Sequence, residues 1–274
     1  MTLLRAGDRL RTALVTGACS GIGHAIARRL GSLGYDLALV SHRREELDAA
    51  ASAIAAEHGV RTIALPFDLA RAEAASELVG RLSEVGFEID ILVNNAGVFF
   101  FGEAADADPE AARRMLELHV VTPSLLVTHL APRMRERRAG HVLIVSSISA
   151  FQDFPGISYY GASKKYLLGF SRAVRSELGV YGVGVTCLAP GPVATALYDA
   201  KGVPVELARR LGVMASPDDV AERGLEAMFR GDEVCVPGIG WRAATLASRA
   251  LPRAAIDAFR RRAPWLGAPG RPKR

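Results

Sequence analysis

The chain has 274 residues, half of them hydrophobic, and no apolar run approaches the roughly 18 residues that a membrane-spanning helix needs. Its net charge of +5 comes from the C-terminal end, because residues 239–274 hold nine Lys and Arg against one acid and the remainder holds 25 basic and 28 acidic residues. With this distribution, and without a zinc-finger or aromatic RNA-binding motif, the sequence predicts neither a membrane-spanning nor a nucleic-acid-binding protein.

Short β-rich segments alternate with longer helical segments along most of the chain. Strands are expected at residues 12–16, 36–40, 61–66, 89–94, 141–146, 184–189 and 233–236. Helices are expected at residues 23–33, 44–58, 72–85, 109–138 and 159–181. This alternation is typical of repeated βαβ units. We therefore predict an α/β fold of the Rossmann type, a doubly wound parallel sheet with helices on both faces, as one domain over residues 1–240.

A glycine-rich loop, TGACSGIG, follows the first strand at residues 16–23. Its three glycines let the backbone turn sharply and approach a pyrophosphate, which the N-terminus of the next helix stabilises. A tight strand-to-helix turn without a ligand also uses glycines, but the place of this loop at the first strand favours a dinucleotide site. The expected contacts are Gly17, Cys19, Ser20, Gly21, Ile22 and Gly23.

The end of the second strand indicates which dinucleotide is bound. The strand is followed by His42, Arg43 and Arg44, and the first acid after the strand is Glu45. An acid at this point binds the ribose hydroxyls of NAD, whereas a basic side chain suits the 2′-phosphate of NADP. We expect NADP(H) in preference to NAD(H), with Arg43 binding the phosphate through two hydrogen bonds and His42 beside it. The alternative is a solvated start to the following helix.

Tyr160 and Lys164 are separated by one helical turn, so their side chains share a helix face. A lysine ammonium beside a phenol favours the phenolate, which lowers the pKa of the tyrosine from its ordinary value near 10. Such a group can donate and accept protons near neutral pH. Taken alone, a Tyr–Lys pair at this spacing also occurs on solvated helix faces.

Together these motifs resemble those of the short-chain dehydrogenase/reductase family, in its shorter single-domain form. The resemblance runs from about residue 11 to residue 237 and includes Asp68-Leu69, Asn94-Asn-Ala-Gly97, Ser147, Tyr160-Gly-Ala-Ser-Lys164 and Pro190-Gly-Pro-Val-Ala-Thr195. It implies an oxidoreductase that transfers a hydride between NADP(H) and a small carbonyl or alcohol substrate. The alternative is a non-catalytic NAD(P)-binding sensor or scaffold on the same fold.

The resemblance also implies a role for each motif. Ser147 would bind the substrate oxygen, Tyr160 would exchange its proton, and Lys164 would bind the nicotinamide ribose and lower the pKa of Tyr160. Further cofactor contacts are implied for Asp68 and Leu69 beside the adenine, for Asn95, Ala96 and Gly97 near the nicotinamide ribose, and for Pro190, Gly191, Val193 and Thr195 beside the nicotinamide.

Two other serines compete with Ser147 for the catalytic role. If the fifth strand continues through this point, Ser146 points to the opposite face of the sheet. Ser149 lies two residues further along, and the family spacing of thirteen residues before Tyr160 selects Ser147.

His119 occupies a position where the family has an asparagine that anchors a water in a proton relay. The imidazole is either part of this relay or a buried ring with satisfied nitrogens. Pro123 has no N–H with which to bond the carbonyl of His119, four residues earlier. We therefore hypothesise that this freed carbonyl, rather than the imidazole, holds the relay water.

Substrate specificity is implied for residues 196–213, a largely apolar segment. Phe99–Phe101 either add a further apolar wall or belong to the core. These segments favour an apolar or amphiphilic substrate. Helices 109–138 and 159–181 resemble the family's dimerisation helices and imply a homodimer or homotetramer.

Residues 241–274 are expected to form a basic amphipathic extension. Because Pro252 interrupts it, contact with a membrane surface is not favoured over a helix that closes the site or contacts a partner subunit. The cysteines, Cys19, Cys187 and Cys235, match neither a disulfide framework nor a zinc site, so no metal is expected. The N-terminus has no signal-peptide pattern, and we expect a cytoplasmic protein.

Overall fold

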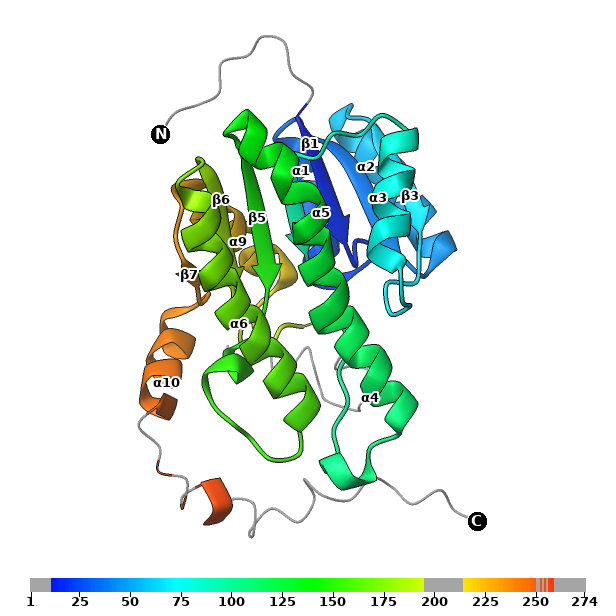
Figure 1. Ribbon diagram of the computed structural model, residues 1–274. Coiled ribbons are helices and arrows are strands. Elements are labelled where there is room, and N and C mark those ends of the chain that lie inside the picture. The colour runs from blue at the N-terminus through cyan, green and yellow to red at the C-terminus, as the bar shows by residue number, and fades with distance from the viewer. Residues whose placement is uncertain (1–10, 195–213, 250–251, 253, 255, 259–274) are drawn as a thin grey trace.

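The structure, a computed structural model, describes residues 11–194 and 214–249 together with residues 252, 254 and 256–258 (Figure 1). In this part of the chain seven strands form one sheet in the order β3-β2-β1-β4-β5-β6-β7, and all six neighbouring pairs are parallel. The strands are β1 (Thr12–Thr16), β2 (Asp36–Ser41), β3 (Thr62–Pro66), β4 (Ile91–Asn94), β5 (Gly140–Val145), β6 (Val183–Leu188) and β7 (Val234–Cys235). The predicted fold class is confirmed, and every predicted strand end lies within two residues of the observed one.

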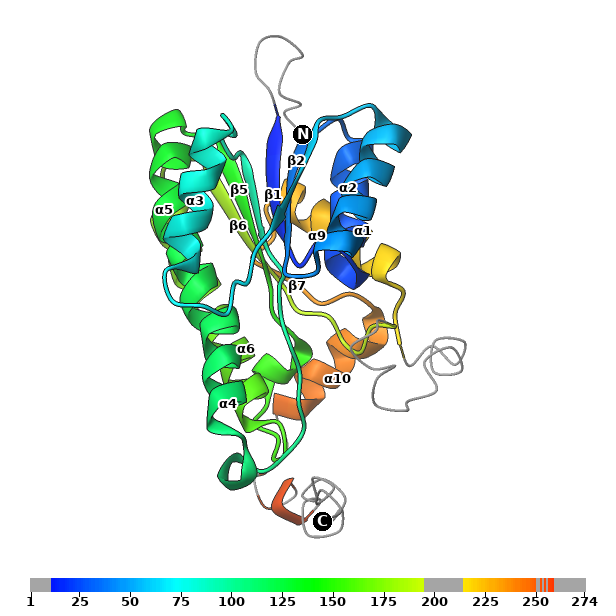
Figure 2. The same ribbon diagram turned by 90° about the vertical axis from the view of Figure 1, so that its right-hand side faces the viewer.

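Helices cover both faces of the sheet, as Figure 2 shows. One face carries α1 (Gly21–Ser32), α2 (Arg44–His58) and α9 (Pro217–Arg230), and the other carries α3 (Ala74–Glu84), α5 (Thr122–Arg137) and α6 (Ser158–Gly179). Successive strand residues point to opposite faces, so Val15 packs with the first set of helices and Leu14 with the second. Both faces are therefore buried, which explains why the strands read as continuous apolar runs.

The strand order reverses direction between β1 and β4. The chain leaves β1 toward β2 on one side and reaches β4 on the other, so the loops after these two strands diverge at the carboxyl edge of the sheet. Such a switch point is where open α/β sheets bind their ligands. The predicted glycine loop follows β1, and the predicted Asn-Asn-Ala-Gly motif begins at the end of β4.

The helical stretch expected over residues 109–138 is present, but it is not one uninterrupted α-helix. It consists of α4 (Pro109–Leu116), a π-helical turn η2 (Glu117–Val121) and α5. In the π turn the N–H of Thr122 donates to the carbonyl of Glu117, five residues earlier. Pro123 has no N–H to continue the α-helical pattern, and a π turn accommodates the missing bond.

Three further elements are η1 (Ala104–Asp106), η3 (Ile148–Phe151) and the helix α10 (Ile239–Arg249), and the described residues 254 and 256–258 are also helical. Among the described helices, none has the length and apolar character to span a membrane. The extension expected from residue 241 thus begins within a helix that starts at Ile239.

Candidate active site

At Gly17 and Gly23, the glycine loop after β1 and the first turn of α1 leave no room for a side chain. Gly17 and Gly21 have φ values of +68° and +57°, in the left-handed region that glycine favours. A Cβ on Gly23 would lie 2.2 Å from the carbonyl oxygen of Gly17 and 2.4 Å from Nδ2 of Asn95. The first turn of α1 is therefore pressed directly onto the loop, as a pyrophosphate-binding loop requires.

Asn95 joins the glycine loop to the loop after β4. Its Nδ2 donates to the carbonyls of Thr16, at 2.9 Å, and Gly17, at 3.3 Å. In return, Oγ1 of Thr16 accepts the N–H groups of Asn95 and Ala96 at 2.9 and 3.0 Å. This network fixes the two predicted cofactor-binding loops to each other at the switch point.

The N-terminus of α1 suits an anion. Its N-cap residue, Ser20, makes no side-chain hydrogen bond to the backbone of this helix, and the first turn contains no acid. The positive end of the helix dipole and the N–H groups of the first turn face the loop without a competing carboxylate from the helix itself. The residues present thus fit a dinucleotide pyrophosphate.

Arg43 lies beside the glycine loop at the end of β2. Its Nη2 donates to Oγ of Ser20 at 2.6 Å and contacts Sγ of Cys19 at 3.0 Å, and its Nη1 pairs with Glu46 at 2.5 Å. The guanidinium is partly exposed, and His42 beside it is exposed. Among these basic side chains, Arg43 is the one in contact with the loop.

Asp68 is fixed in the turn after β3. One carboxylate oxygen accepts the N–H of Ala70 at 3.0 Å and the other pairs with Arg114 at 2.9 Å. Burial raises the pKa of this carboxyl, but the hydrogen bonds and the positive charges of Arg114 and His42 together lower it below its ordinary value. The buried Leu69 accepts the Thr122 hydroxyl through its carbonyl at 2.8 Å.

Lys164 is buried beneath the predicted catalytic tyrosine. Its Nζ donates to the carbonyl of Val145 at 3.1 Å and lies 5.6 Å from the centroid of the Tyr160 ring. Burial lowers the pKa of Lys164 to about 8, and Cys187 acts weakly in the opposite direction. The two side chains share a helix face, as their spacing predicts, and the ammonium is held in a water-poor site.

A phenylalanine ring packs against the Tyr160 ring. Phe99 packs edge-on against it with ring centroids 4.7 Å apart, and Phe101 packs edge-on against Phe99 at 4.6 Å. The segment that carries these rings is joined to the loop before α6, because the N–H of Gly102 donates to the carbonyl of Gly156 at 2.9 Å. The expected apolar wall is thus in direct contact with the tyrosine.

The three serines after β5 differ in what they contact. Ser146 is buried and its hydroxyl donates to the carbonyl of Lys164 at 2.7 Å. Ser149 is also buried, and its hydroxyl has no hydrogen-bond partner among the described residues. Ser147 is partly exposed and is the N-cap of η3, where its Oγ accepts the N–H of Ser149 at 3.2 Å. Of the three, Ser147 alone is open to solvent and lies at the carboxyl edge of the sheet.

Both nitrogens of His119 are engaged inside the protein. Nε2 accepts the N–H of Val98 at 2.9 Å, so the proton resides on Nδ1, which donates to Oγ of Ser163 at 2.9 Å. The Ser163 hydroxyl in turn donates to the carbonyl of Tyr160 at 2.8 Å. Burial, and then the charge of Lys164, lower the pKa of His119 well below its ordinary value. The ring is neutral and joins the loop after β4 to α6, the helix that carries Tyr160 and Lys164.

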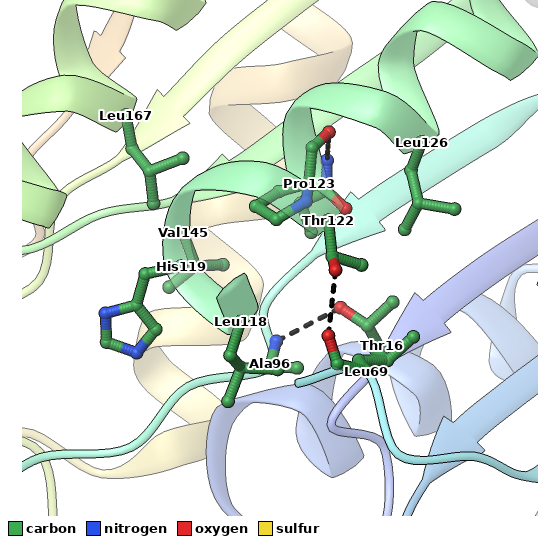
Figure 3. A pocket seen from close by; sticks show the side chains of 11 residues that line it. Thr16, Leu69, Ala96, Leu118, His119, Thr122, Pro123, Leu126, Val145 and Leu167 are labelled. Carbon is green, nitrogen blue, oxygen red and sulfur yellow. Dashed lines mark hydrogen bonds between the residues drawn. The ribbon is translucent and has the colours of Figure 1, made fainter. Parts of the chain in front are cut away.

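A water-sized cavity of about 10 Å³ lies under the π turn (Figure 3). Hydrogen bonds from Ala96 to Thr16 and from Thr122 to Leu69 border it, and Nδ2 of Asn94 donates to the carbonyl of Pro123 at 3.1 Å. Asn94 therefore anchors the start of α5 to the sheet.

The loop after β6 carries the predicted nicotinamide contacts. The N–H of Ile148 donates to the carbonyl of Pro190 at 3.0 Å, which joins this loop to the turn that begins at Ser147. Val193 is buried and bridged to Ala215. Thr195 and the expected specificity segment, residues 196–213, lie outside the described residues.

The sequence did not predict three contacts of the site: Ser163 with His119, Val98 with His119, and Trp241 of α10 with Gly191. Each joins segments that are distant in the chain. The position of Ser163 between Tyr160 and Lys164 is the one available signal for the first.

A family model described as short chain dehydrogenase matches residues 11–203. The Homo sapiens protein "Dehydrogenase/reductase SDR family member 4" is 38% identical over 186 residues, which are 68% of this chain and 66% of that protein. The match thus spans slightly less than two thirds of the length of that relative.

Two solved structures are similar over most of the chain. A short-chain dehydrogenase from Sphingobium yanoikuyae in complex with NADPH has a TM-score of 0.78 and 30% identity, covering 92% of this chain and 94% of that one. L-Sorbose reductase from Gluconobacter frateurii, complexed with NADPH and L-sorbose, has a TM-score of 0.74 and 26% identity, covering 85% and 97%.

Proposed function

The chain belongs to the short-chain dehydrogenase family, and we propose that it transfers a hydride between NADP(H) and the carbonyl or alcohol group of an apolar or amphiphilic small molecule. The observation that carries the proposal is the buried Lys164, which lies 5.6 Å from the Tyr160 ring. The pair and the glycine loop both lie at the carboxyl edge of the sheet, because Lys164 bonds the last residue of β5 and the loop follows β1. A bound nicotinamide would supply the hydride chemistry.

The protein's own part is to control charge and protons at the substrate oxygen. In the direction of carbonyl reduction, negative charge develops on this oxygen. The Ser147 hydroxyl would donate a hydrogen bond to it, and Tyr160 would donate its phenolic proton. The ammonium of Lys164 would then stabilise the resulting phenolate, since an opposite charge nearby favours the ionised form.

The route by which Tyr160 regains a proton would pass Lys164 and the backbone of the π turn. The imidazole of His119 has no free nitrogen for this role, because Val98 and Ser163 occupy both. Pro123 leaves the carbonyl of His119 without its α-helical partner. These contacts support the hypothesis that the carbonyl, rather than the ring, would hold a relay water.

Preference for NADP(H) would rest on Arg43. Its guanidinium contacts Ser20 and Cys19 of the glycine loop, and a guanidinium can bind a phosphate through two hydrogen bonds. The relatives from Sphingobium and Gluconobacter were solved with NADPH, which supports the same cofactor for this chain.

Preference for an apolar substrate would rest on the aromatic side chains that follow β4. Phe99 and Phe101 would form a wall beside the reacting oxygen.

Self-association would rest on apolar side chains on the outer faces of α5 and α6, where Leu125 and Tyr166 are exposed. We propose these faces as the contact of a homodimer or homotetramer.

The test is a panel of ketones, aldehydes and alcohols, followed by the absorbance of the reduced nicotinamide with NADPH, NADH and their oxidised forms. We expect turnover of an apolar carbonyl with NADPH. Tight NADPH binding without turnover of any compound in the panel would instead support the non-catalytic sensor.

A further inference from the structure

The C-terminal helix α10 turns one face toward the candidate active site. It packs against η3, the turn that begins at Ser147, and both views place it at the end of the molecule where the strands terminate (Figures 1 and 2). Thr245 on the inner face is buried and its hydroxyl donates to the carbonyl of Trp241 at 2.7 Å. Ile239 and Leu246 point outward, with 86% and 66% of their surface exposed. This helix lies beyond residues 11–203, which the family model matches.

The indole of Trp241 covers Gly191, in the loop after β6. A Cβ built on Gly191 would lie 2.7, 2.8 and 2.9 Å from Cδ2, Cε2 and Cγ of the indole, and these are its three nearest atoms. Gly191 is not among the described glycines with a positive φ, so its backbone conformation is open to other residues. The indole of Trp241 is therefore what excludes a side chain at this position.

The loop under the indole is joined to the catalytic serine turn. The N–H of Ile148, the residue after Ser147, donates to the carbonyl of Pro190, the residue before Gly191, at 3.0 Å. Helix α10 thus packs on η3, and its Trp241 packs on the loop after β6, which is hydrogen-bonded to η3. A shift of the indole would move both segments together, because one hydrogen bond couples them.

We propose that Trp241 is a positioning residue for catalysis, which fixes the loop bordering the nicotinamide relative to the turn carrying Ser147. This proposal rests on the proposed function. A tryptophan suits the role because its ring is large and has few rotatable bonds. Displacement of reacting groups by about 1 Å can slow an enzyme on the order of a hundredfold. The C-terminal helix is thereby a part of the catalytic unit.

The kinetic test compares Trp241→Ala and Trp241→Phe with Leu246→Ala, a control on the exposed face of the same helix. We expect Trp241→Ala to lower kcat on the order of tenfold or more with a smaller change in the KM for NADPH, and to raise the isotope effect seen with deuterated NADPH. Trp241→Phe should restore part of the rate, and Leu246→Ala should match the wild type. A folded Trp241→Ala protein with wild-type kcat and isotope effect would overturn the proposal.

A second test uses the contact itself and needs no catalysis. In the cofactor-free protein, Gly191→Ala should lower the thermal unfolding temperature because its methyl group meets the indole. The added destabilisation should be much smaller when Gly191→Ala is introduced into the Trp241→Ala protein. Equal effects in the two backgrounds would overturn the contact. Absence of turnover in the wild type would refute the proposed function but leave this test intact.

Discussion

Replacing Lys164 with methionine tests the electrostatics on which the candidate site depends. The ammonium is buried, and burial lowers its pKa from 10.5 to about 8. At neutral pH the folded protein must therefore hold a charge that the unfolded chain keeps in water. Since one pKa unit corresponds to about 1.36 kcal/mol, the buried charge costs about 3 kcal/mol of folding free energy at pH 7.

This cost depends on pH in a definite direction. The pKa of Lys164 is lower in the folded than in the unfolded protein, so between about pH 8 and 10.5 the unfolded chain binds more protons. The free energy of unfolding therefore rises with pH across this window. From pH 7 to pH 9.5 the contribution of Lys164 alone amounts to about 2 kcal/mol.

The assay is urea unfolding of the cofactor-free wild type and Lys164→Met at both pH values. Methionine also removes the hydrogen bond to the carbonyl of Val145, but this loss is nearly the same at both pH values and cancels in the comparison. We expect the wild type to gain about 2 kcal/mol relative to the variant on going to pH 9.5. An unchanged difference would refute the assignment of a buried, charged lysine.

Three further predictions concern the cofactor loop and the π turn. Arg43→Ala should weaken NADPH binding on the order of tenfold or more, since a hydrogen bond to a charged group contributes about 1.5–3 kcal/mol. NADH binding should be unchanged. Equal losses of affinity for both cofactors, measured by fluorescence titration, would contradict the 2′-phosphate role. His119→Asn should keep most of the turnover rate whereas Pro123→Ala should slow it, because the proline frees the carbonyl proposed to hold the relay water; the opposite ranking of kcat would assign the relay to the imidazole. Gly23→Ala should destabilise the protein by about 1–3 kcal/mol and weaken NADPH binding, because its methyl group meets the carbonyl of Gly17; Gly80→Ala, where a Cβ meets nothing within 4 Å, is the control in thermal unfolding.

The sequence was sufficient to predict the placement of a site residue where a pattern within one helix or strand determines it. The helical period places Lys164 on the face of Tyr160. Ser146 and Ser147 follow the end of β5, and their different contacts agree with the expectation that the two side chains point in different directions. The basic end of β2 likewise led to Arg43, which contacts the glycine loop.

Contacts between distant segments could not be predicted in this way. The proline at position 123 indicated a missing hydrogen bond, but not that the helix would respond with a π turn. The partners of the His119 ring come from the loop after β4 and from α6, and the indole over Gly191 comes from α10. Such contacts depend on how elements pack, and the residue pattern within one element does not encode them.

The central claim is that Tyr160 exchanges a proton with the substrate oxygen, and Tyr160→Phe tests it most directly. The variant removes one oxygen and keeps the ring that packs against Phe99. With the best carbonyl substrate and NADPH, we predict a loss of kcat of about 10²–10⁴-fold with unchanged NADPH affinity. A kcat within a few-fold of the wild type would contradict the assignment.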